Sequence, residues 1–377
     1  MDHEKRIDIL REMALSKSHL HYVKTKLLSA TDEGKQEHTI TDRARDFEKY
    51  LQESEPFIQD WELIIGGYSL CLSPQSTLNP GIADRIHNTP NYAMVLNMGF
   101  GGICRKAQKL LETTIDNDKR EYYESVEISY SAASDFVRRY IALANEMAEK
   151  ESDYQRKIEL SKISEVCSNI TTEPANSFWD ALQLLWFSAL LIGIDKYSTG
   201  KGPIGRLDQF LFPFYQRDIQ NGSLKKEQAQ ELLECLWIKF NMRSIQDGLV
   251  VYDNGNNIML GGQTSDGKDA TNKLTYMCLN STANVRLVEP KVNVRFHDGT
   301  EMKLLEKACR VIKLGMGMPC LYNDRNAIPA LINTGIPLED AREYTNDGCT
   351  ELYIPGKSDL SFYVCPMLQE FHNFLFG

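Results

Sequence analysis

Three short runs in the second half of the chain, each apolar or alternating between apolar and polar residues, are separated by helical patterns, and this order limits the fold more than any other feature. The runs occupy residues 257–260, 291–296 and 319–322, and helical patterns occupy 302–314 and 338–344. Strands that are separated by helices usually run parallel, because each helix carries the chain back along the sheet. The second half therefore predicts an α/β fold.

Helical periodicity dominates the first half of the chain. Helices are predicted at residues 7–28, 43–51, 104–115, 120–150, 177–191 and 225–240. The longest apolar run, 184–194, is interrupted by Ser188 and is shorter than the roughly 20 residues that span a bilayer, so it predicts a buried helix and no membrane segment. Because the chain has neither low-complexity segments nor a repeat of fixed period, residues 1–377 are predicted to form one continuous domain.

The composition is typical of a large globular enzyme core. The chain has 377 residues, of which 42% are hydrophobic and 25% are charged. A net charge of −10 argues against a general nucleic-acid surface, because phosphate binding needs a basic face. No apolar segment follows the charged N-terminus, so no secretory signal is predicted and the protein is expected in the cytoplasm. The nine cysteines contain no Cys-x-x-Cys pair and no zinc spacing, which predicts reduced thiols and no metal site.

A cysteine and a carboxylate lie two residues apart near the end of the chain, in the sequence Gly348-Cys349-Thr350-Glu351. If this stretch is extended, Cys349 and Glu351 project to the same side and Thr350 points away. Gly348 leaves room for the close approach of a ligand or of a second backbone segment. A thiol and a carboxylate that face one substrate can carry chemistry, although such a pair also arises by chance in a chain with many cysteines.

Six further stretches, in order along the chain, support a family resemblance: 62–66, 87–96, 205–213, 261–276, 317–324 and 339–344. Together with Gly348, Cys349 and Glu351 they resemble the glycyl radical enzymes, the pyruvate formate-lyase-like family, over most of the chain from about residue 45 onward. In that family Gly-Cys-x-Glu marks the tip of a loop inside a barrel.

The resemblance implies a ten-stranded α/β barrel of two half-barrels, surrounded by helices. Residues 1–250 are then expected to be mainly helical, and residues 251–377 are expected to form part of the barrel with the cysteine loop. The family's C-terminal glycyl radical domain has no counterpart in the sequence. Residues 367–375 are predicted to form a helix with an apolar face, and such a face usually packs against another segment. We therefore expect an incomplete barrel.

The resemblance also implies a radical mechanism. A glycyl radical, installed by a radical-SAM activating enzyme, would take hydrogen from Cys349, and the thiyl would abstract hydrogen from a small-molecule substrate. Glu351 would act as the general base. No cofactor is expected within this chain itself, and a homodimer and an anaerobic setting are expected. Asn323 and Asp324 are expected to shape the pocket floor or to form a turn.

Three further residues are candidates for substrate binding. His87 matches a histidine at the substrate hydroxyls of dehydratase-like members, and an ordinary histidine at a helix start or in a loop is the alternative. Asp359 lies in a matching Pro-Gly-Lys-Ser-Asp stretch, where a turn or cap is the alternative. Lys201, in a glycine-rich loop, could bind an anionic substrate or simply be solvated. Arg206 and Asp208 are expected to form an ion pair or hydrogen-bond set that positions the barrel.

Departures from the family pattern narrow the function. Pyruvate formate-lyase itself uses two adjacent cysteines, whereas Cys349 is followed by Thr350, so acetyl transfer from pyruvate is not expected. The favoured function is a lyase that cleaves a C–O, C–N, C–S or C–C bond by elimination or decarboxylation, with the glycine loop on a longer chain or on a partner chain. The alternative is a noncatalytic fragment, remnant or interaction subunit. A radical-free enzyme with Cys349 as nucleophile is the third interpretation, although no histidine lies near it in sequence.

Overall fold

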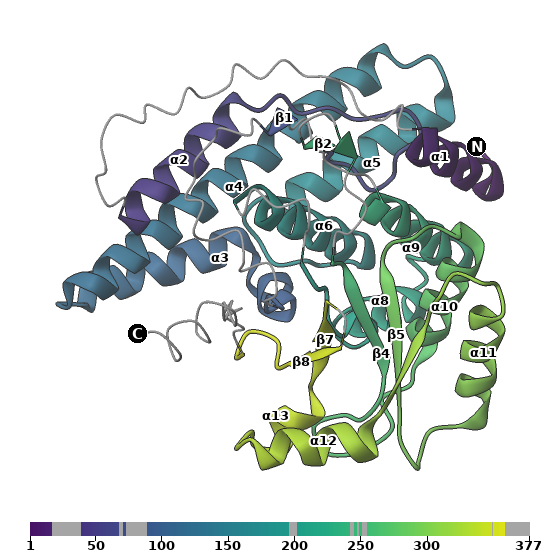
Figure 1. The fold of residues 1–377 in the computed structure, drawn as a ribbon. Helices are drawn as coiled ribbons and strands as arrows, with labels where there is room; N and C mark the ends of the chain where they lie inside the picture. Colours follow the sequence, from purple (N-terminus) through teal and green to yellow (C-terminus); the bar gives the residue numbers. More distant parts are fainter. Residues whose placement is uncertain are drawn as a thin grey trace, which may run out of the picture.

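The computed structural model of the chain describes residues 1–16, 39–67, 71–72, 89–195, 202–241, 245–246, 249–250, 255–348 and 350–358 (Figure 1). Its helices are α1 (His3–Ser16), α2 (Ile40–Glu53), α3 (Tyr92–Thr113), α4 (Asn117–Lys150), α5 (Tyr154–Ile170), α6 (Phe178–Asp195), α7 (Leu207–Phe210), α8 (Phe212–Gln220), α9 (Lys226–Asn241), α10 (Lys273–Val285), α11 (Met302–Ile312), α12 (Asp324–Asn333) and α13 (Leu338–Arg342). Its strands are β1 (Cys71–Leu72), β2 (Ile245–Gln246), β3 (Leu249–Val250), β4 (Asn257–Gly261), β5 (Lys291–Phe296), β6 (Cys320–Asn323), β7 (Thr345–Asp347) and β8 (Glu351–Tyr353).

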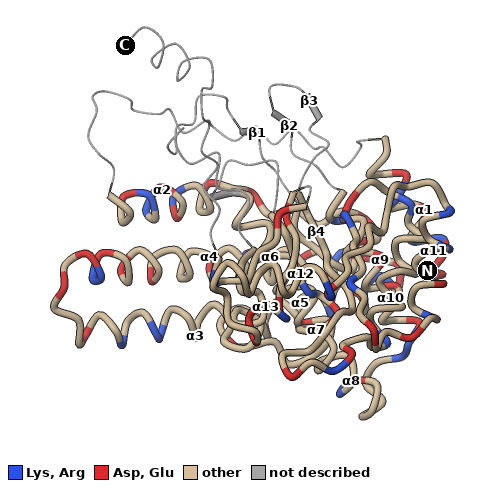
Figure 2. Tube along the Cα trace, turned by 60° about the horizontal axis from the view of Figure 1, so that its bottom comes forward, with Lys and Arg blue, Asp and Glu red and all other residues tan. Residues whose placement is uncertain are grey.

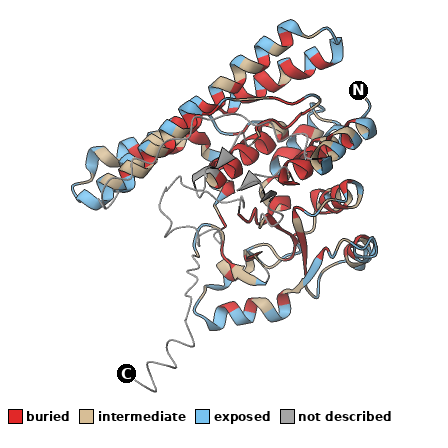
Figure 3. Ribbon diagram, turned by 45° about the horizontal axis from the view of Figure 1, so that its top comes forward, coloured by how far each residue is buried: buried red, intermediate tan, exposed pale blue. Residues whose placement is uncertain are grey.

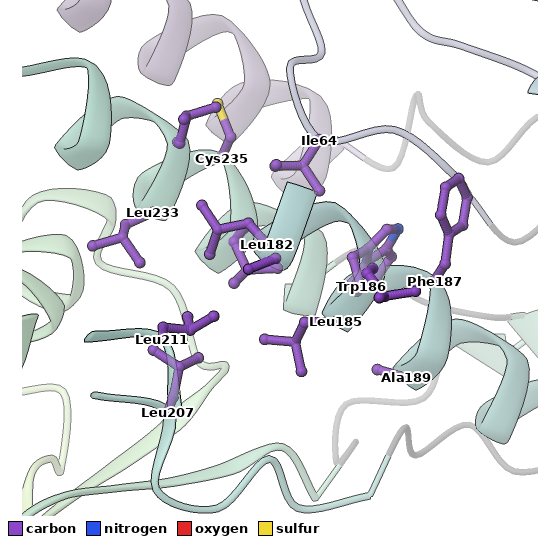
Figure 4. Close-up of a cluster of buried hydrophobic side chains, with 14 of the residues drawn as sticks. Ile64, Leu182, Leu185, Trp186, Phe187, Ala189, Leu207, Leu211, Leu233 and Cys235 are labelled. Carbon is purple, nitrogen blue, oxygen red and sulfur yellow. The ribbon is translucent and has the colours of Figure 1, made fainter. Parts of the chain in front are cut away.

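Helix α6 lies at the centre of the helical layer, in contact with α3, α5, α8 and α9. Every side chain from residue 181 to residue 190 is buried. Figure 4 shows Leu182, Leu185 and Trp186 among apolar side chains from neighbouring elements, including Ile64 and Leu233. Each large apolar side chain contributes about 1.5–3 kcal/mol when it is fully buried. The predicted buried helix is therefore confirmed, and no helix in the described ranges is long and apolar enough to cross a membrane.

Helices α2 and α3 both pack along α4, and the three helices extend together from the rest of the structure. Residues at the far end of this group are exposed (Figure 3). Apolar residues of α4 recur every three or four positions, as in Ala133, Phe136 and Tyr140, and these are buried. The carboxylate of Asp116 caps the start of α4 by accepting a hydrogen bond from the Lys119 amide at 3.1 Å. Acidic and basic residues are interspersed along these helices (Figure 2).

The sheet β4-β5-β6 is parallel, with α10 between β4 and β5 and α11 between β5 and β6. This arrangement confirms the predicted strands with helical crossovers. Its two faces differ in chemistry. The helical face, formed by Ile258, Leu260, Val292 and Val294, is buried in the main hydrophobic cluster with α9, α10 and α11. The opposite face, here called the hairpin face, is formed by Asn257, Met259, Asn293 and Arg295.

Helix α3 begins earlier than the predicted helix at 104–115. The glycines at 99, 101 and 102 lower helix propensity, but α3 runs from Tyr92 with a kink at Gly99, where φ is 67°. The kink arises because the backbone of residues 173–174 crosses there, and a Cβ atom on Gly99 would lie 2.3 Å from the Glu173 carbonyl oxygen. The sequence analysis does not predict helices α5, α7, α8, α10 and α12, whereas β5 has the predicted bounds.

Candidate active site

The segment that contains the cysteine motif forms a hairpin on the hairpin face of the sheet. Strands β7 and β8 are antiparallel, and Asp347 pairs with Glu351 across them. Cys349 itself lies outside the described residues. The stretch is therefore not one extended strand, because the chain turns between Asp347 and Glu351. The side on which Glu351 projects is set by its strand pairing with Asp347. It is not set by side chains that alternate along one extended strand through Thr350.

Both backbone groups of Gly348, its amide and its carbonyl, form hydrogen bonds. Its amide donates a hydrogen bond to the Asp347 carboxylate at 2.6 Å, and its carbonyl accepts one from the Asn257 side chain at 3.2 Å. Its φ is 54°, in the left-handed region that favours glycine. The entry into the cysteine position is thus fixed by one group of the hairpin and one group of the sheet.

Glu351 lies at the start of β8 and is half-buried. Its carboxylate accepts a hydrogen bond from the Thr350 amide at 3.0 Å. Asp347, directly opposite, is 1% exposed. Residues that are directly opposite in an antiparallel pair project to the same side, so two carboxylates share one side of the hairpin.

A buried ion pair anchors the start of the hairpin. The guanidinium of Arg295 donates to both carboxylate oxygens of Asp324, at 2.8 and 2.9 Å, and to the Tyr344 carbonyl at 3.0 Å. The Tyr344 hydroxyl donates to Asp324 at 2.8 Å, and the Arg295 guanidinium lies 3.9 Å from the centre of the Tyr344 ring. Burial raises the pKa of Tyr344, which keeps this hydroxyl a donor. Asn323 caps α12 through the Arg325 amide, so the two residues expected at a pocket floor or turn act as a helix cap and an anchor.

Arg206 and Asp208 fix the other end of β4. Arg206 donates to the Glu343 carboxylate at 2.7 Å and to the Gly261 carbonyl at 3.0 Å. Asp208 accepts from the Gly261 amide at 2.9 Å and from the Thr275 hydroxyl at 2.6 Å. Burial lowers the pKa of Arg206 and raises the pKa of Asp208. The expected hydrogen-bond set is confirmed, and the two residues meet at Gly261, where Arg206 binds the carbonyl and Asp208 binds the amide.

The other predicted site residues, His87, Lys201 and Asp359, lie outside the described residues. Their roles stay predictions. Three described residues lie close to them in sequence: Thr89 is two residues after His87, Gly205 is four residues after Lys201, and Gly356 is three residues before Asp359.

These three flanking positions converge beside the hairpin. The Gly356 amide donates to the Thr89 carbonyl at 2.9 Å. A Cβ atom on Gly205 would lie 3.1 Å from the Thr89 methyl group, 3.9 Å from the Thr345 methyl group and 3.9 Å from the ring Cγ of Pro355. The side-chain hydroxyls of Thr89 and Thr345 are buried and have no hydrogen-bond partner within the described part of the chain. The segments next to His87, Lys201 and Asp359 therefore meet the hairpin that contains Cys349. They meet beside the buried hydroxyls of Thr89 and Thr345.

A cavity of about 260 Å³ lies next to this meeting point. It is lined in part by Asn91, Arg206, Glu343, Ile354 and Lys357. Both cations are paired, since Lys357 contacts Asp340 at 2.6 Å and Arg206 contacts Glu343. Within the described ranges, no group of three or more His, Cys, Asp or Glu side chains could hold a metal ion.

Sequence reasoning did not identify Asn257, Asn293 or Arg295 as part of this site. Their signal was present, because each is a polar residue at an alternate position of a predicted strand whose other positions are apolar. Asn293 donates to the Asn346 side chain at 3.0 Å, between the contacts that Arg295 and Asn257 make.

Two curated relatives match most of the chain. The (2S)-3-sulfopropanediol dehydratase of Klebsiella oxytoca is 36% identical over 75% of this chain and 36% of its own length. The isethionate sulfite-lyase of Desulfovibrio desulfuricans is 34% identical over 71% of this chain and 34% of its own length. The chain thus spans about a third of the length of these relatives.

Solved structures give the same picture. The glycerol-bound form of the B12-independent glycerol dehydratase from Clostridium butyricum matches with a TM-score of 0.80 and 29% identity, over 94% of this chain and 55% of that chain. A glycyl radical enzyme from Archaeoglobus fulgidus matches with a TM-score of 0.78 and 25% identity, over 93% of this chain and 55% of that chain.

These neighbours confirm the predicted fold class, an α/β fold with a helical region and an incomplete barrel. The family model described as pyruvate formate lyase-like matches residues 73–369. The chain therefore belongs to the pyruvate formate lyase-like family of glycyl radical enzymes.

Proposed function

We propose that this chain carries the cysteine loop of a radical lyase, with Cys349 as the thiyl residue and Glu351 as the general base. The main support is the β7–β8 hairpin on the hairpin face of the sheet. In this hairpin Cys349 lies in sequence between two carboxylate residues, Asp347 and Glu351, which are opposite each other in the strand pair. The convergence of the chain next to His87, Lys201 and Asp359 on this hairpin adds further support.

The proposed chemistry is a cycle that ends when the product radical takes a hydrogen atom back from the Cys349 thiol and so restores the thiyl. The Cys349 thiyl takes a hydrogen atom from a substrate C–H bond, which restores the thiol and leaves a carbon-centred substrate radical. Glu351 takes the proton of a neighbouring hydroxyl, and the extra negative charge on that oxygen expels the leaving group from the adjacent carbon. General-base help of this kind is worth roughly 10²–10⁴-fold in rate.

A glycyl radical, held outside this chain and installed by a radical-SAM activating enzyme, would supply the unpaired electron by taking hydrogen from Cys349. The residues present fit an added segment or ligand, because the buried hydroxyls of Thr89 and Thr345 are left without partners among the described residues. Buried polar atoms of this kind usually receive a partner. A cytoplasmic, anaerobic setting and a homodimer belong to the same proposal.

The substrate class in this proposal is a small hydroxylated molecule. The relatives' names describe a sulfopropanediol dehydratase and an isethionate sulfite-lyase, and a structural neighbour holds glycerol. His87 and Asp359 would hold the substrate hydroxyls. Lys201 would bind an anionic group, where one is present.

The test uses the natural polypeptide assembly, isolated anaerobically and identified by intact mass. Cys349→Ser should abolish turnover, whereas Cys320→Ser, which removes an exposed thiol in β6, should leave it unchanged. Glu351→Gln should lower kcat by roughly 10²–10⁴-fold and leave the glycyl radical signal in electron paramagnetic resonance intact.

Turnover that survives in Cys349→Ser would contradict the radical assignment. A native mass of 43.0 kDa with no glycine-loop partner and no turnover would instead favour the noncatalytic alternative.

A further inference from the structure

We propose that Asn257 is a positioning residue for the cysteine loop, because it fixes the carbonyl of the residue directly before Cys349. The inference rests on the role of Cys349 proposed above. The side-chain amide of Asn257 donates to the Gly348 carbonyl at 3.2 Å, and these two residues lie 91 positions apart in the sequence. Asn257 acts through the backbone of Gly348.

The backbone of Asn257 is well fixed in the structure. The residue is 1% exposed and begins β4, where it lies opposite Lys291 of β5. Its carbonyl accepts from the Ile204 amide at 2.8 Å and from the Gly205 amide at 3.2 Å, and its own amide donates to the Gly255 carbonyl at 2.9 Å. The backbone of Asn257 is therefore hydrogen-bonded through both its amide and its carbonyl, so the side chain projects from a fixed point.

Two further contacts hold the hairpin along the same face. Arg295 donates to the Tyr344 carbonyl, and Asn293 donates to the Asn346 side chain. With the contact to Gly348, every second residue from 344 to 348 is bound by a side chain of the sheet. Three bonds at a spacing of two residues fix the register of β7 on the sheet, because a slip by one residue would break all of them.

The contact to Gly348 has a specific consequence for the next residue. A peptide unit is planar, so the Gly348 carbonyl oxygen lies in one plane with the amide and Cα of residue 349. The Asp347 carboxylate holds the Gly348 amide at the other side. With both groups held, the direction in which the chain enters the cysteine position is set before any substrate binds.

The test compares Asn257 with its neighbour Asn256. Asn256 is equally buried, but its side-chain amide donates to the Phe240 carbonyl of α9, on the helical layer. Asn257→Ser and Asn256→Ser each remove one buried side-chain amide without changing the charge of the chain. Asn257→Asp and Asn256→Asp form a second pair that keeps the side-chain shape and removes the donor.

The first readout needs no turnover. Alkylation of Cys349 by iodoacetamide is followed in the 377-residue chain by peptide mass spectrometry, together with amide hydrogen exchange in peptides that cover residues 345–353. Asn257→Ser should raise both rates by about fivefold to tenfold, as expected for the loss of one buried hydrogen bond. Asn256→Ser should stay within about twofold of the unchanged chain.

The second readout is turnover of the complete enzyme. Asn257→Ser should lower kcat by about 10²-fold and leave KM within about twofold, because a displaced reacting group costs rate and not substrate affinity. A loss of stability alone would lower the amount of active enzyme equally in Asn256→Ser.

The outcomes separate this inference from the proposed function. If Cys349→Ser stays active, the radical assignment fails, and the alkylation and exchange rates still decide whether Asn257 fixes the loop. If Cys349→Ser is inactive but the Asn257 and Asn256 variants have equal rates in both readouts, the positioning role is overturned. If the serine variants do not fold, the aspartate pair gives the same comparison.

Discussion

Arg295 and Asp324 are both fully buried, and each is the main partner of the other. Removing one partner of such a pair leaves a charge in the interior without compensation, which is usually far more costly than the pair itself is stabilising. Tyr344 adds a hydroxyl and an aromatic face to the same group. At the scale of single residues, this cluster connects the sheet to the hairpin that carries the motif.

Asp324→Ala should lower the free energy of unfolding by about 3–5 kcal/mol, because the Arg295 guanidinium stays buried without its carboxylate. Urea unfolding of the 377-residue chain, followed by circular dichroism, measures the change. Asp340→Ala is the control, since its partner Lys357 is mostly exposed, and it should cost at most about 1 kcal/mol. Equal losses in both variants would contradict the anchoring role of Asp324.

The cysteine motif could be predicted from sequence, because Cys349 and Glu351 are neighbours in the chain. The groups that hold the motif could not, since each lies far from its partner along the chain. Gly348 is 91 residues from Asn257, and Asn346 is 53 residues from Asn293. Local patterns report periodicity and turn chemistry, but the choice of partner depends on packing.

At the scale of elements, α3 depends on one glycine and tolerates another. Gly99 has φ 67° and ψ 167°, a region that is nearly restricted to glycine, and the Glu173 carbonyl occupies the space of a side chain. Gly102 is helical, and the nearest atom to a Cβ there lies at 3.4 Å. The kink also explains why sequence reasoning began this helix late, since a glycine-rich stretch weakens the helical signal.

Gly99→Ala should destabilise the protein by about 1–3 kcal/mol through backbone strain alone, and the contact with residue 173 adds to this cost. Gly102→Ala should be neutral or stabilise by up to about 1 kcal/mol, because alanine favours a helix. Thermal unfolding of the two variants side by side measures the contrast. A melting temperature that falls equally in both would show that the kink at Gly99 is dispensable.

Helix α1 is held to α5 by buried charges. Arg6 donates to Glu159 at 3.2 Å and makes a second, shorter contact with it, and Arg156 donates to the same carboxylate at 3.1 Å. Burial by itself raises the pKa of Glu159, but the hydrogen bonds from Arg6 and Arg156 outweigh it, so the pKa is lowered. The Glu159 side chain is 9% exposed, which limits screening by solvent.

A carboxyl group whose pKa is lower in the folded state binds fewer protons there than in the unfolded chain. Its stabilisation is therefore present above the ordinary pKa of about 4.5 and is lost as the pH falls through the lower, folded value. The difference in free energy of unfolding between the unchanged chain and Glu159→Gln should be largest near pH 7 and should shrink below pH 4.5. Urea unfolding at both pH values tests this, and a difference that does not change with pH would contradict it.

At the scale of the whole molecule, the two hydrophobic clusters are unequal. The main cluster runs from α1 to α11 and includes the helical face of the sheet. Among the described residues, the second contains six buried ones: Met259, Ile328, Leu331, Ala341, Tyr344 and Ile354. Since local stability follows buried apolar contact, the part with α12 and α13 should open more easily than the helical layer.

Native-state amide exchange measured by mass spectrometry should show this difference. Amides of α12 and α13 should exchange on the order of tenfold or more faster than those of α6 and α9. Uniform exchange across these helices would instead mean that the two clusters open as one cooperative unit.

The convergence at Gly205 also has a consequence for the order of assembly. The helices α3, α4 and α5 each pack against the next helix along the chain, whereas the meeting of Thr89, Gly205 and Gly356 joins distant parts of the chain. Contacts between distant parts form more slowly, because a large loop must close before they are gained. A chain that emerges from the ribosome can thus complete its helical layer first. The segment with the candidate catalytic cysteine then joins a scaffold that has already formed.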